Sequence, residues 1–257
     1  MSLVAIVYHL VPDAPILVAC NREESFSQAI AAPSIQSGKP RILASVDSKT
    51  GGTRLGVNQN GMFAVAIPRK KFVVPSVPRS RGALCRNMLR CGSARQAVDL
   101  ALEELQSDQY AGVNLVVADA ESGWVIHGGN DFNACPMDEG LSIIGDRDID
   151  DRSDERVRLT HRLLTLQMLD SPVKFLAVAS KVFARSPLPG GRSGMVIREK
   201  DIQTVNSTLL SLGKKPRDAI YQYANGAPDQ TKYEDYSPLL RDILSRGLRE
   251  SRTRANA

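Results

Sequence analysis

The feature that most constrains the fold is an apolar run that stops abruptly in four polar residues. Residues 16–20 read Ile-Leu-Val-Ala-Cys, the composition of a buried strand, and Asn21, Arg22, Glu23 and Glu24 follow at once. A strand that ends in an amide, a guanidinium and two carboxylates predicts a polar cluster at a sheet edge, where functional sites are often built. Another apolar run, 3–10, precedes it, so we expect an N-terminal hairpin.

Charge and composition exclude several classes of function. The net charge is +5, and basic residues gather in segments 68–71, 79–95, 147–162 and 246–254. Neither interleaved aromatic residues nor a known nucleic-acid-binding module accompanies them, so we interpret them as solvated surface and expect no nucleic-acid partner. No apolar run is long enough to span a bilayer, and the start of the chain lacks a signal-peptide pattern. We therefore expect a soluble, cytoplasmic protein.

Cysteine and histidine usage argues against a metal site. The four cysteines show no C-x-x-C spacing, and the three histidines are not paired at ligand spacing. A zinc site is therefore not expected. In a chain without a secretion signal, such cysteines are interpreted as buried small hydrophobic residues rather than disulfide partners.

Turn signals and apolar periodicity predict hairpins, two helices, strands, two further helices, more strands and a last helix. The expected strands are 3–10, 16–20, 41–46, 51–57, 62–67, 114–118, 123–127, 141–144, 194–197, 204–212 and 219–224. The expected helices are 80–91, one starting at Ser93, 153–168, 172–183 and one starting near Ser237, while 25–40 is expected to be a loop.

This element order favours one fold class. Short turns join most strands, so the sheets should be largely antiparallel, and each helix pair must cover a sheet face. We predict an α+β fold, a four-layer α/β/β/α sandwich, formed by a single domain over residues 1–248. Residues 249–257 are expected to form a basic, disordered tail.

Several segments resemble one known family. Residues 19–24, Ala-Cys-Asn-Arg-Glu-Glu, resemble the Asn-Arg-Asp-Glu signature of the NRDE family, also called the transport and Golgi organisation 2 family. Residues 51–61 resemble its Gly-Gly-Thr-Trp-Leu-Gly-Val block, and 204–210 are similar to its late Gly-Thr-x-Ser-Ser-Thr strand. Region 144–156 lies where the family carries a Ser-Asn-x-x-Leu-Asp run. Together these segments extend over most of residues 1–224.

The resemblance implies a fold and a chemistry. The family looks like a remote branch of the N-terminal nucleophile hydrolases, which have the four-layer sandwich. In such enzymes the initiator Met is removed, and the new terminal Cys, Ser or Thr attacks an amide or ester carbonyl. The free α-amine, with a pKa near ~8, acts as the base for its own side chain. The implied function here is cleavage or transfer of an acyl group from an amide or thioester, with Ser2 as nucleophile.

The resemblance also implies catalytic roles for the polar cluster, and each residue has a structural alternative. Ser2 is either the nucleophile or an ordinary second residue. Arg22 either supports the charge state of the nucleophile or forms an ion pair with Glu23 or Glu24. Asn21 either orients a substrate carbonyl or satisfies backbone groups at the strand end. Glu23 replaces the family Asp, and its extra methylene shifts the carboxylate.

Departures from the family pattern argue against full activity. Ile67-Pro68 and Gly145-Asp146 stand where the hydrolases carry oxyanion-hole asparagines, and Arg54 replaces a Trp. Losing such donors weakens transition-state stabilisation. The candidate ligand-binding residues are Arg54, Asn58, Asp146 and Asn206.

The alternative function is a non-catalytic protein that binds or moves a small apolar ligand in the same cleft. The resemblance implies a lipid, an acyl-CoA or haem as that ligand. Haem ligation requires an exposed His, Cys, Met or Tyr side chain. His9, His127 and His161 are interpreted as structural histidines, so haem is the weaker version and no cofactor is assigned.

Overall fold

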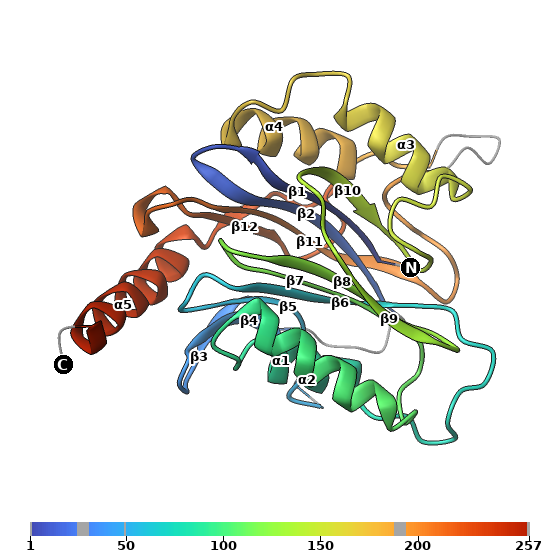
Figure 1. Cartoon of the computed structure of the whole chain (residues 1–257). Helices are drawn as coiled ribbons and strands as arrows, with labels where there is room; N and C mark the ends of the chain where they lie inside the picture. Colours follow the sequence, from blue (N-terminus) through green and yellow to red (C-terminus); the bar gives the residue numbers. More distant parts are fainter. Residues whose placement is uncertain (1, 25–30, 49, 188–193, 256–257) are drawn as a thin grey trace. The chain divides into compact units, whose positions relative to one another are not determined.

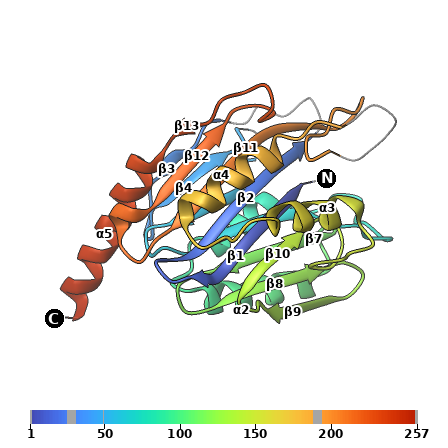
Figure 2. The same ribbon diagram turned by 90° about the horizontal axis from the view of Figure 1, so that it is seen from above.

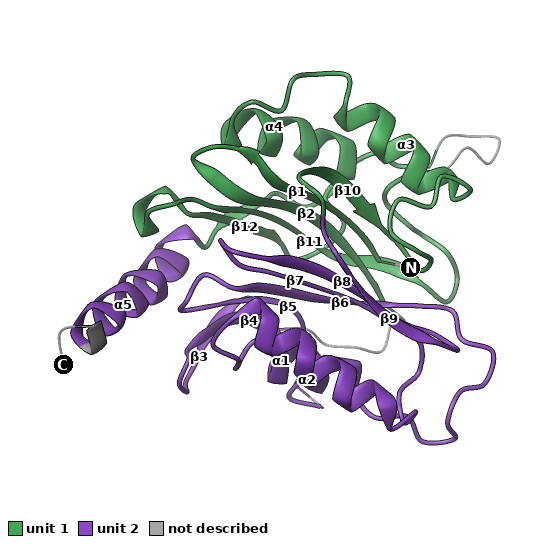
Figure 3. Cartoon of the chain, in the orientation of Figure 1, with its two compact units in different colours: residues 1–28, 138–236 green, residues 29–137, 237–257 purple. Residues whose placement is uncertain are grey.

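A computed structural model of the 257-residue chain describes residues 2–24, 31–48, 50–187 and 194–255. Contacts divide the chain into two compact units (Figure 3). The first comprises residues 1–28 and 138–236, and the second comprises residues 29–137 and 237–257. Each unit contains one sheet with helices on one of its faces (Figure 1).

The first unit holds an antiparallel sheet in the order β10-β1-β2-β11-β12-β13. Its strands are β1 (Leu3–Val11), β2 (Ala14–Glu24), β10 (Gly140–Ile144), β11 (Gln203–Leu212), β12 (Ile220–Ala224) and β13 (Glu234–Asp235). The helices α3 (Glu155–Leu164) and α4 (Pro172–Phe183) cover one face of this sheet (Figure 1). A short 3-10 helix, Pro216–Asp218, links β11 to β12.

Strand alternation sorts the residues of this sheet into two faces. Leu3 and Ala5 of β1 and Leu17 and Ala19 of β2 belong to the core cluster that includes Phe175 of α4. Within 3–7 of β1 and 17–23 of β2, the odd-numbered residues therefore face the helices, and the even-numbered residues face the other side. This parity decides where each residue of the polar cluster lies.

The second unit holds an antiparallel sheet in the order β3-β4-β5-β6-β7-β8-β9. Its strands are β3 (Ser34–Gln36), β4 (Ile42–Val46), β5 (Thr53–Asn58), β6 (Phe63–Pro68), β7 (Val113–Ala118), β8 (Gly123–Gly128) and β9 (Phe132–Pro136). The helices α1 (Arg81–Met88) and α2 (Ala94–Gln106) pack on one face of it, and the last helix, α5 (Ser237–Ala255), contacts β3, β4 and β5 (Figures 1 and 2).

Local sequence signals explain several element boundaries. Ser93 accepts a hydrogen bond from the backbone of Gln96 as the N-cap of α2, and Ser171 precedes Pro172 at the start of α4. Both arrangements satisfy amide groups that an α-helix leaves unpaired in its first turn. At Gly52, a Cβ atom would lie 2.6 Å from the carbonyl carbon of Gly82 in α1. The first glycines of the 51–57 block thus permit close approach of strand and helix.

The structure confirms an α+β fold with two antiparallel sheets in the described part of the chain. It differs from the predicted elements at several places. The strand predicted at 16–20 continues through Glu24, because β11 pairs with its polar end. Residues 194–197 are not a strand, and α3 ends at Leu164 rather than near Met168. Strand β3 lies within the predicted loop 25–40, so that prediction was wrong at 34–36, and the short strands β9 and β13 had no sequence prediction.

The C-terminal segment also differs from its prediction. Helix α5 continues to Ala255, so residues 249–255 of the predicted tail are helical, and residues 256–257 lie outside the described residues. Glu250 accepts hydrogen bonds from Arg41 and Gln59, which attaches this helix to its own unit. The predicted loop 25–40 includes residues 25–30, which also lie outside the described residues.

Candidate functional site

Three sequence-predicted site residues form one row across the sheet of the first unit. Arg22 of β2 and Asn206 of β11 are paired in register. β1 pairs with β2 through Leu3 and Asn21, and one further step of that antiparallel register sets Ser2 opposite Arg22. Because directly opposed residues share a face, Ser2, Arg22 and Asn206 lie together on the face away from α3 and α4.

Ser2 is held against the end of β2. Its Oγ accepts a hydrogen bond from the backbone N–H of Glu23 at 3.3 Å, and the residue is only 6% exposed. The hydroxyl therefore has a defined position next to the polar cluster. Asp146 follows β10 by two residues and is buried.

Arg22 is buried and paired within its own strand. Its Nε and Nη2 donate to Glu24 Oε1 at 3.1 and 3.0 Å. Residues two apart on a strand share a face, so this pair stays on the Ser2 side of the sheet. Of the two ion-pair alternatives that the sequence left open, the structure contains the one with Glu24. The pair fixes a cationic group beside the serine.

Asn206 carries an unused hydrogen-bond donor. Its Nδ2 is buried and has no hydrogen-bond partner among the residues that the structure describes. Buried amide groups are nearly always hydrogen-bonded, and an exception requires an explanation such as a ligand or a functional role. The register of β2 and β11 is irregular between Thr204 and Asn206, which is typical of a bulge that redirects a side chain.

Asn21 and Glu23 lie on the opposite, helix-covered face. Asn21 Nδ2 donates to the carbonyl groups of Phe183 and Met195 at 2.9 and 3.0 Å. Its amide thus joins β2 to the end of α4 and to the segment that follows. Both amide hydrogens of Asn21 are used in this way, which corresponds to the structural alternative predicted for this residue.

Glu23 forms an ion pair with Arg156 of α3. Arg156 Nη2 donates to Glu23 Oε1 at 3.0 Å and to the Met195 carbonyl at 2.9 Å. Asp154, the N-cap of α3, accepts the backbone N–H of Arg156 at 2.8 Å and so helps to fix that first turn. Burial raises the pKa of the Glu23 carboxyl, and the charge of Arg156 opposes this shift.

Cys20 precedes the cluster and is not positioned for nucleophilic chemistry. It is buried, and burial, together with the Glu23 carboxylate, raises the pKa of its thiol to about 12 against the opposing charge of Arg22. A thiol with such a pKa stays protonated near neutral pH and is a weak nucleophile.

The other two candidate ligand residues, Arg54 and Asn58, lie in the second unit. Asn58 Nδ2 donates to the carbonyl groups of Leu89 and Cys91, and its Oδ1 accepts the backbone N–H groups of Asn60 and Met62. These bonds stabilise the hairpin turn and the end of α1. Strand alternation puts Arg54 on the same helix-covered face of β5 as Asn58.

One buried polar pair lies within the second sheet. His127 Nδ1 lies 2.9 Å from Asn114 Oδ1 within the second sheet. Among the described residues, no group of His, Cys, Asp and Glu side chains is arranged to hold a metal ion. None of the described helices combines the length and apolarity of a membrane span.

Comparison with known proteins identifies the family. The family model for Transport and Golgi organisation 2 matches residues 1–172, about two thirds of the chain. The chain belongs to the Transport and Golgi organisation 2 family. A comparison with curated proteins gave no match.

Solved structures with a similar fold are N-terminal nucleophile hydrolases. A Caenorhabditis elegans ortholog of N-acylethanolamine-hydrolyzing acid amidase is 12% identical, with a TM-score of 0.53, over 81% of this chain and 92% of that chain. A mutant and a variant of the conjugated bile acid hydrolase from Clostridium perfringens are 11% and 12% identical, with a TM-score of 0.54, over 93% of both chains. At these identities the likeness shows that the Transport and Golgi organisation 2 chain shares their fold.

Two residues of the site had no sequence prediction: Arg156 as the partner of Glu23, and Thr204. Thr204 pairs with Glu23 in register, and its Oγ1 accepts the backbone N–H of Ile197. The sequence did contain a signal that Glu23 has a partner. It is an acidic residue at a helix-facing position of a strand, and a buried carboxylate needs a cationic or hydrogen-bonding partner. The sequence of this family member does not specify where that partner lies.

Proposed function

We propose that this protein is an N-terminal nucleophile hydrolase or acyltransferase that acts on an acyl amide or thioester. The observation that carries the proposal is the row of Ser2, Arg22 and Asn206 on one face of a sheet. It combines a hydroxyl, a fixed cation and an unused amide donor, the groups required for nucleophilic attack on a carbonyl.

The proposed reaction starts with removal of Met1, which frees the α-amine of Ser2. That amine accepts the hydroxyl proton while Oγ forms a bond to the carbonyl carbon. The carbonyl oxygen becomes an oxyanion, and Asn206 Nδ2 donates a hydrogen bond to it. Collapse of this intermediate breaks the bond to the amine or thiol, which leaves with the proton from the α-ammonium. The α-amine then takes a proton from water or from a second acceptor, whose nucleophilic atom bonds to the carbonyl carbon of the ester on Ser2. The bond from that carbon to Oγ breaks, the acyl group leaves as the acid or on the acceptor, and the α-ammonium returns its proton to Oγ.

Arg22 contributes electrostatically in this scheme. A guanidinium next to Ser2 favours the neutral form of the α-amine, which is the form that acts as a base. Glu24 holds the guanidinium in place through two hydrogen bonds to one oxygen. Glu23 and Asn21 act through structure, since their side chains tie the end of β2 to α3 and α4.

The substrate class is proposed from chemistry and from the structural neighbours. The names of those neighbours describe hydrolysis of N-acylethanolamines and of conjugated bile acids. An acyl group joined to a small polar amine is therefore the first class to test. The same face of the sheet would also suit the alternative function, binding of an acyl ligand without turnover.

The test combines mass and activity. Intact-mass analysis of the purified chain should show loss of Met1, and a β-lactone acylating agent should add its mass to the peptide that begins at Ser2. Turnover of a panel of fluorogenic acyl amides and thioesters should be lost in Ser2→Ala and retained in part in Ser2→Cys. Retention of Met1 would contradict the catalytic proposal. A lipid extracted from the denatured protein without any turnover would favour the binding alternative.

A further inference from the structure

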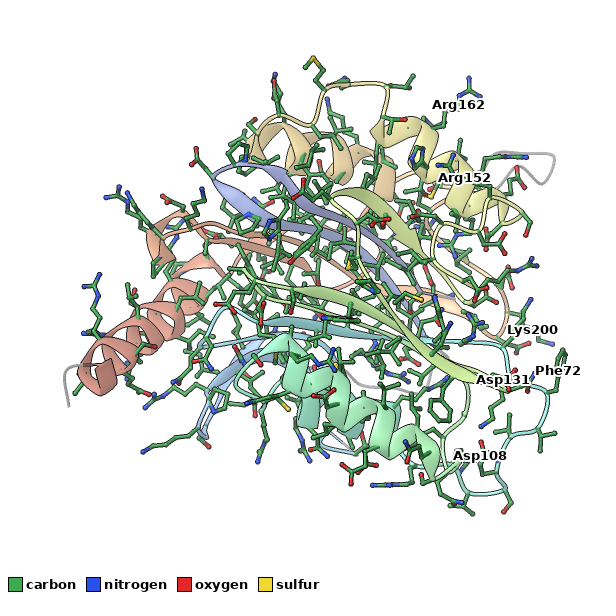
Figure 4. The ribbon with its side chains drawn as sticks, viewed as in Figure 1. Phe72, Asp108, Asp131, Arg152, Arg162 and Lys200 are labelled. Carbon is green, nitrogen blue, oxygen red and sulfur yellow. The ribbon has the colours of Figure 1, made fainter. Side chains whose placement is uncertain are left out.

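The loop that joins β6 to α1 presents apolar side chains to solvent. Phe72 is 93% exposed, Val73 76%, Val74 49% and Val77 83%. Isolated exposed apolar residues are common, but several in one short segment indicate an interaction surface. Figure 4 shows Phe72 at the outer edge of this part of the molecule. We call residues 72–77 the apolar loop.

The base of the apolar loop is fixed by polar contacts within its own unit. The backbone N–H of Phe72 donates to Asn130 Oδ1 at 3.0 Å, and that of Arg79 donates to the Gln109 carbonyl at 2.8 Å. Lys71 Nζ lies 2.5 Å from Asp108 Oδ1 and also donates to the Tyr110 carbonyl. The charged side chain of Lys71 is thus held inward while its neighbour Phe72 points out. The exposure of the apolar side chains is therefore a consequence of the local fold.

The backbone of the apolar loop is suited to an environment poor in water. Pro75 within the apolar loop and Pro78 directly after it have no N–H group, so these two positions have no donor that would remain unsatisfied in lipid. A second apolar side chain, Phe132, is 43% exposed and lies two residues after Asn130, the residue that binds Phe72.

The sequence segment that contains the apolar loop carries charge of one sign. Between Ser48 and Val98 the chain carries ten Lys and Arg residues and no Asp or Glu. Asp108 and Glu104 pair with two of these cations, Lys71 and Arg79. Asp131 is an exposed acidic residue that follows Asn130, the residue that accepts the hydrogen bond of Phe72. An apolar tip on a basic segment is complementary to a bilayer that carries anionic headgroups.

We propose that the apolar loop docks this protein on anionic lipid bilayers. Phe72, Val73 and Val77 enter the boundary between headgroups and acyl chains, while the basic residues of the flanking segment remain at the level of the headgroups. This inference does not depend on the proposed catalytic function, because it uses none of the residues in the Ser2 row.

The experiment is co-sedimentation of the full chain with sucrose-loaded vesicles. Vesicles that contain both phosphatidylcholine and phosphatidylserine should carry the protein into the pellet. A higher salt concentration should weaken this binding. The double variant Phe72→Ser with Val77→Ser should bind at least about tenfold more weakly, since it removes most of the inserted apolar area. The matched control is Leu166→Ser with Met168→Ser, which removes residues that are 69% and 78% exposed elsewhere and should bind like wild type.

Two further variants sharpen the test. Asp131→Asn should strengthen binding, because it removes a negative charge next to the docking segment. Phe72→Trp should show a blue shift of tryptophan emission when phosphatidylserine vesicles are added, which reports entry of that side chain into an apolar environment. All substituted residues are exposed, so thermal melting curves should match that of the wild type.

Three results would overturn the proposal. The first is wild-type protein that stays in the supernatant with vesicles that contain phosphatidylserine. The second is an equal loss of binding in the Leu166 and Met168 control. The third is self-association, measured by analytical ultracentrifugation, that depends on Phe72 and Val77 without any vesicle binding or emission shift. That last result would assign the apolar loop to a contact between copies of this chain.

Discussion

Glu23 Oε1 lies 3.0 Å from Arg156 Nη2, and this ion pair joins β2 to the first turn of α3. The Glu23 side chain is fully buried, and that of Arg156 is 14% exposed. The backbone N–H of the same Glu23 donates to the Ser2 hydroxyl. One residue therefore connects the helix layer on one face of the sheet to the candidate nucleophile on the other.

The first prediction concerns the contribution of the Glu23–Arg156 ion pair to stability. Arg156→Ala should lower the free energy of unfolding by about 3 kcal/mol, because it leaves a buried carboxylate without its cation. Urea denaturation at neutral pH measures the change. Arg152→Ala, on the exposed approach to α3, is the matched control and should change stability by less than about 0.5 kcal/mol. Equal stabilities of the two variants would show that the pair contributes nothing to the fold.

The second prediction is a dependence of stability on pH that originates at Glu23. Its pKa is raised from the ordinary value of 4.5 by burial. Between the ordinary and the folded pKa, the folded carboxyl keeps a proton that the unfolded chain has lost. Its contribution to stability is thus present below about 4.5 and is lost as the pH rises through the folded value.

Glu23→Gln removes this titration while keeping a hydrogen-bond acceptor for Arg156. The stability of the variant relative to the wild type should therefore improve as the pH rises from acidic to neutral. Urea denaturation of both proteins across that range measures the difference. Parallel curves for the two proteins would contradict a raised pKa at Glu23.

The third prediction separates a structural from a ligand-binding role for Asn58. Asn58→Ala should destabilise the fold by about 2 kcal/mol, because it removes bonds to four backbone groups and leaves buried ones unsatisfied. Asn60→Ala, in the same turn but exposed, should cost much less. Thermal melts of both variants provide the measurement. A stable Asn58→Ala protein with altered ligand affinity would favour the ligand-binding role instead.

The sequence predicted what local chemistry determines. Pro172 predicted the start of α4, because its fixed φ angle acts within one turn. The extension of β2 through Glu24 was missed. The polar residues 21–24 have little strand propensity of their own and extend the strand because the backbone of β11 pairs with them. Tertiary pairing overrode local propensity there.

The sequence predicted the candidate site only in part, because tertiary pairing also determines which of its residues lie together. Ser2 and Arg22 were identified from the resemblance, yet their alignment with Asn206 depends on two strand registers that no local pattern encodes. Arg156 lies 133 residues from Glu23, and no motif links them. Parity also separates neighbours, since Asn21 and Glu23 face the helices while Arg22 faces the other side of the sheet.

The last prediction concerns the unused donor of Asn206. If Asn206 Nδ2 stabilises an oxyanion formed at Ser2, Asn206→Ala should lower kcat by about 10²–10³-fold on an acyl amide that the wild type turns over. Stability should change little, because the lost donor has no partner among the described residues. Asn21→Ala is the matched control, and it should lower the melting temperature, since its amide binds the carbonyl groups of Phe183 and Met195. Kinetic assays and thermal melts on the same preparations distinguish the two residues. A fully active Asn206→Ala protein would remove Asn206 from the mechanism, and activity would then have to rest on Arg22 and backbone donors near Ser2.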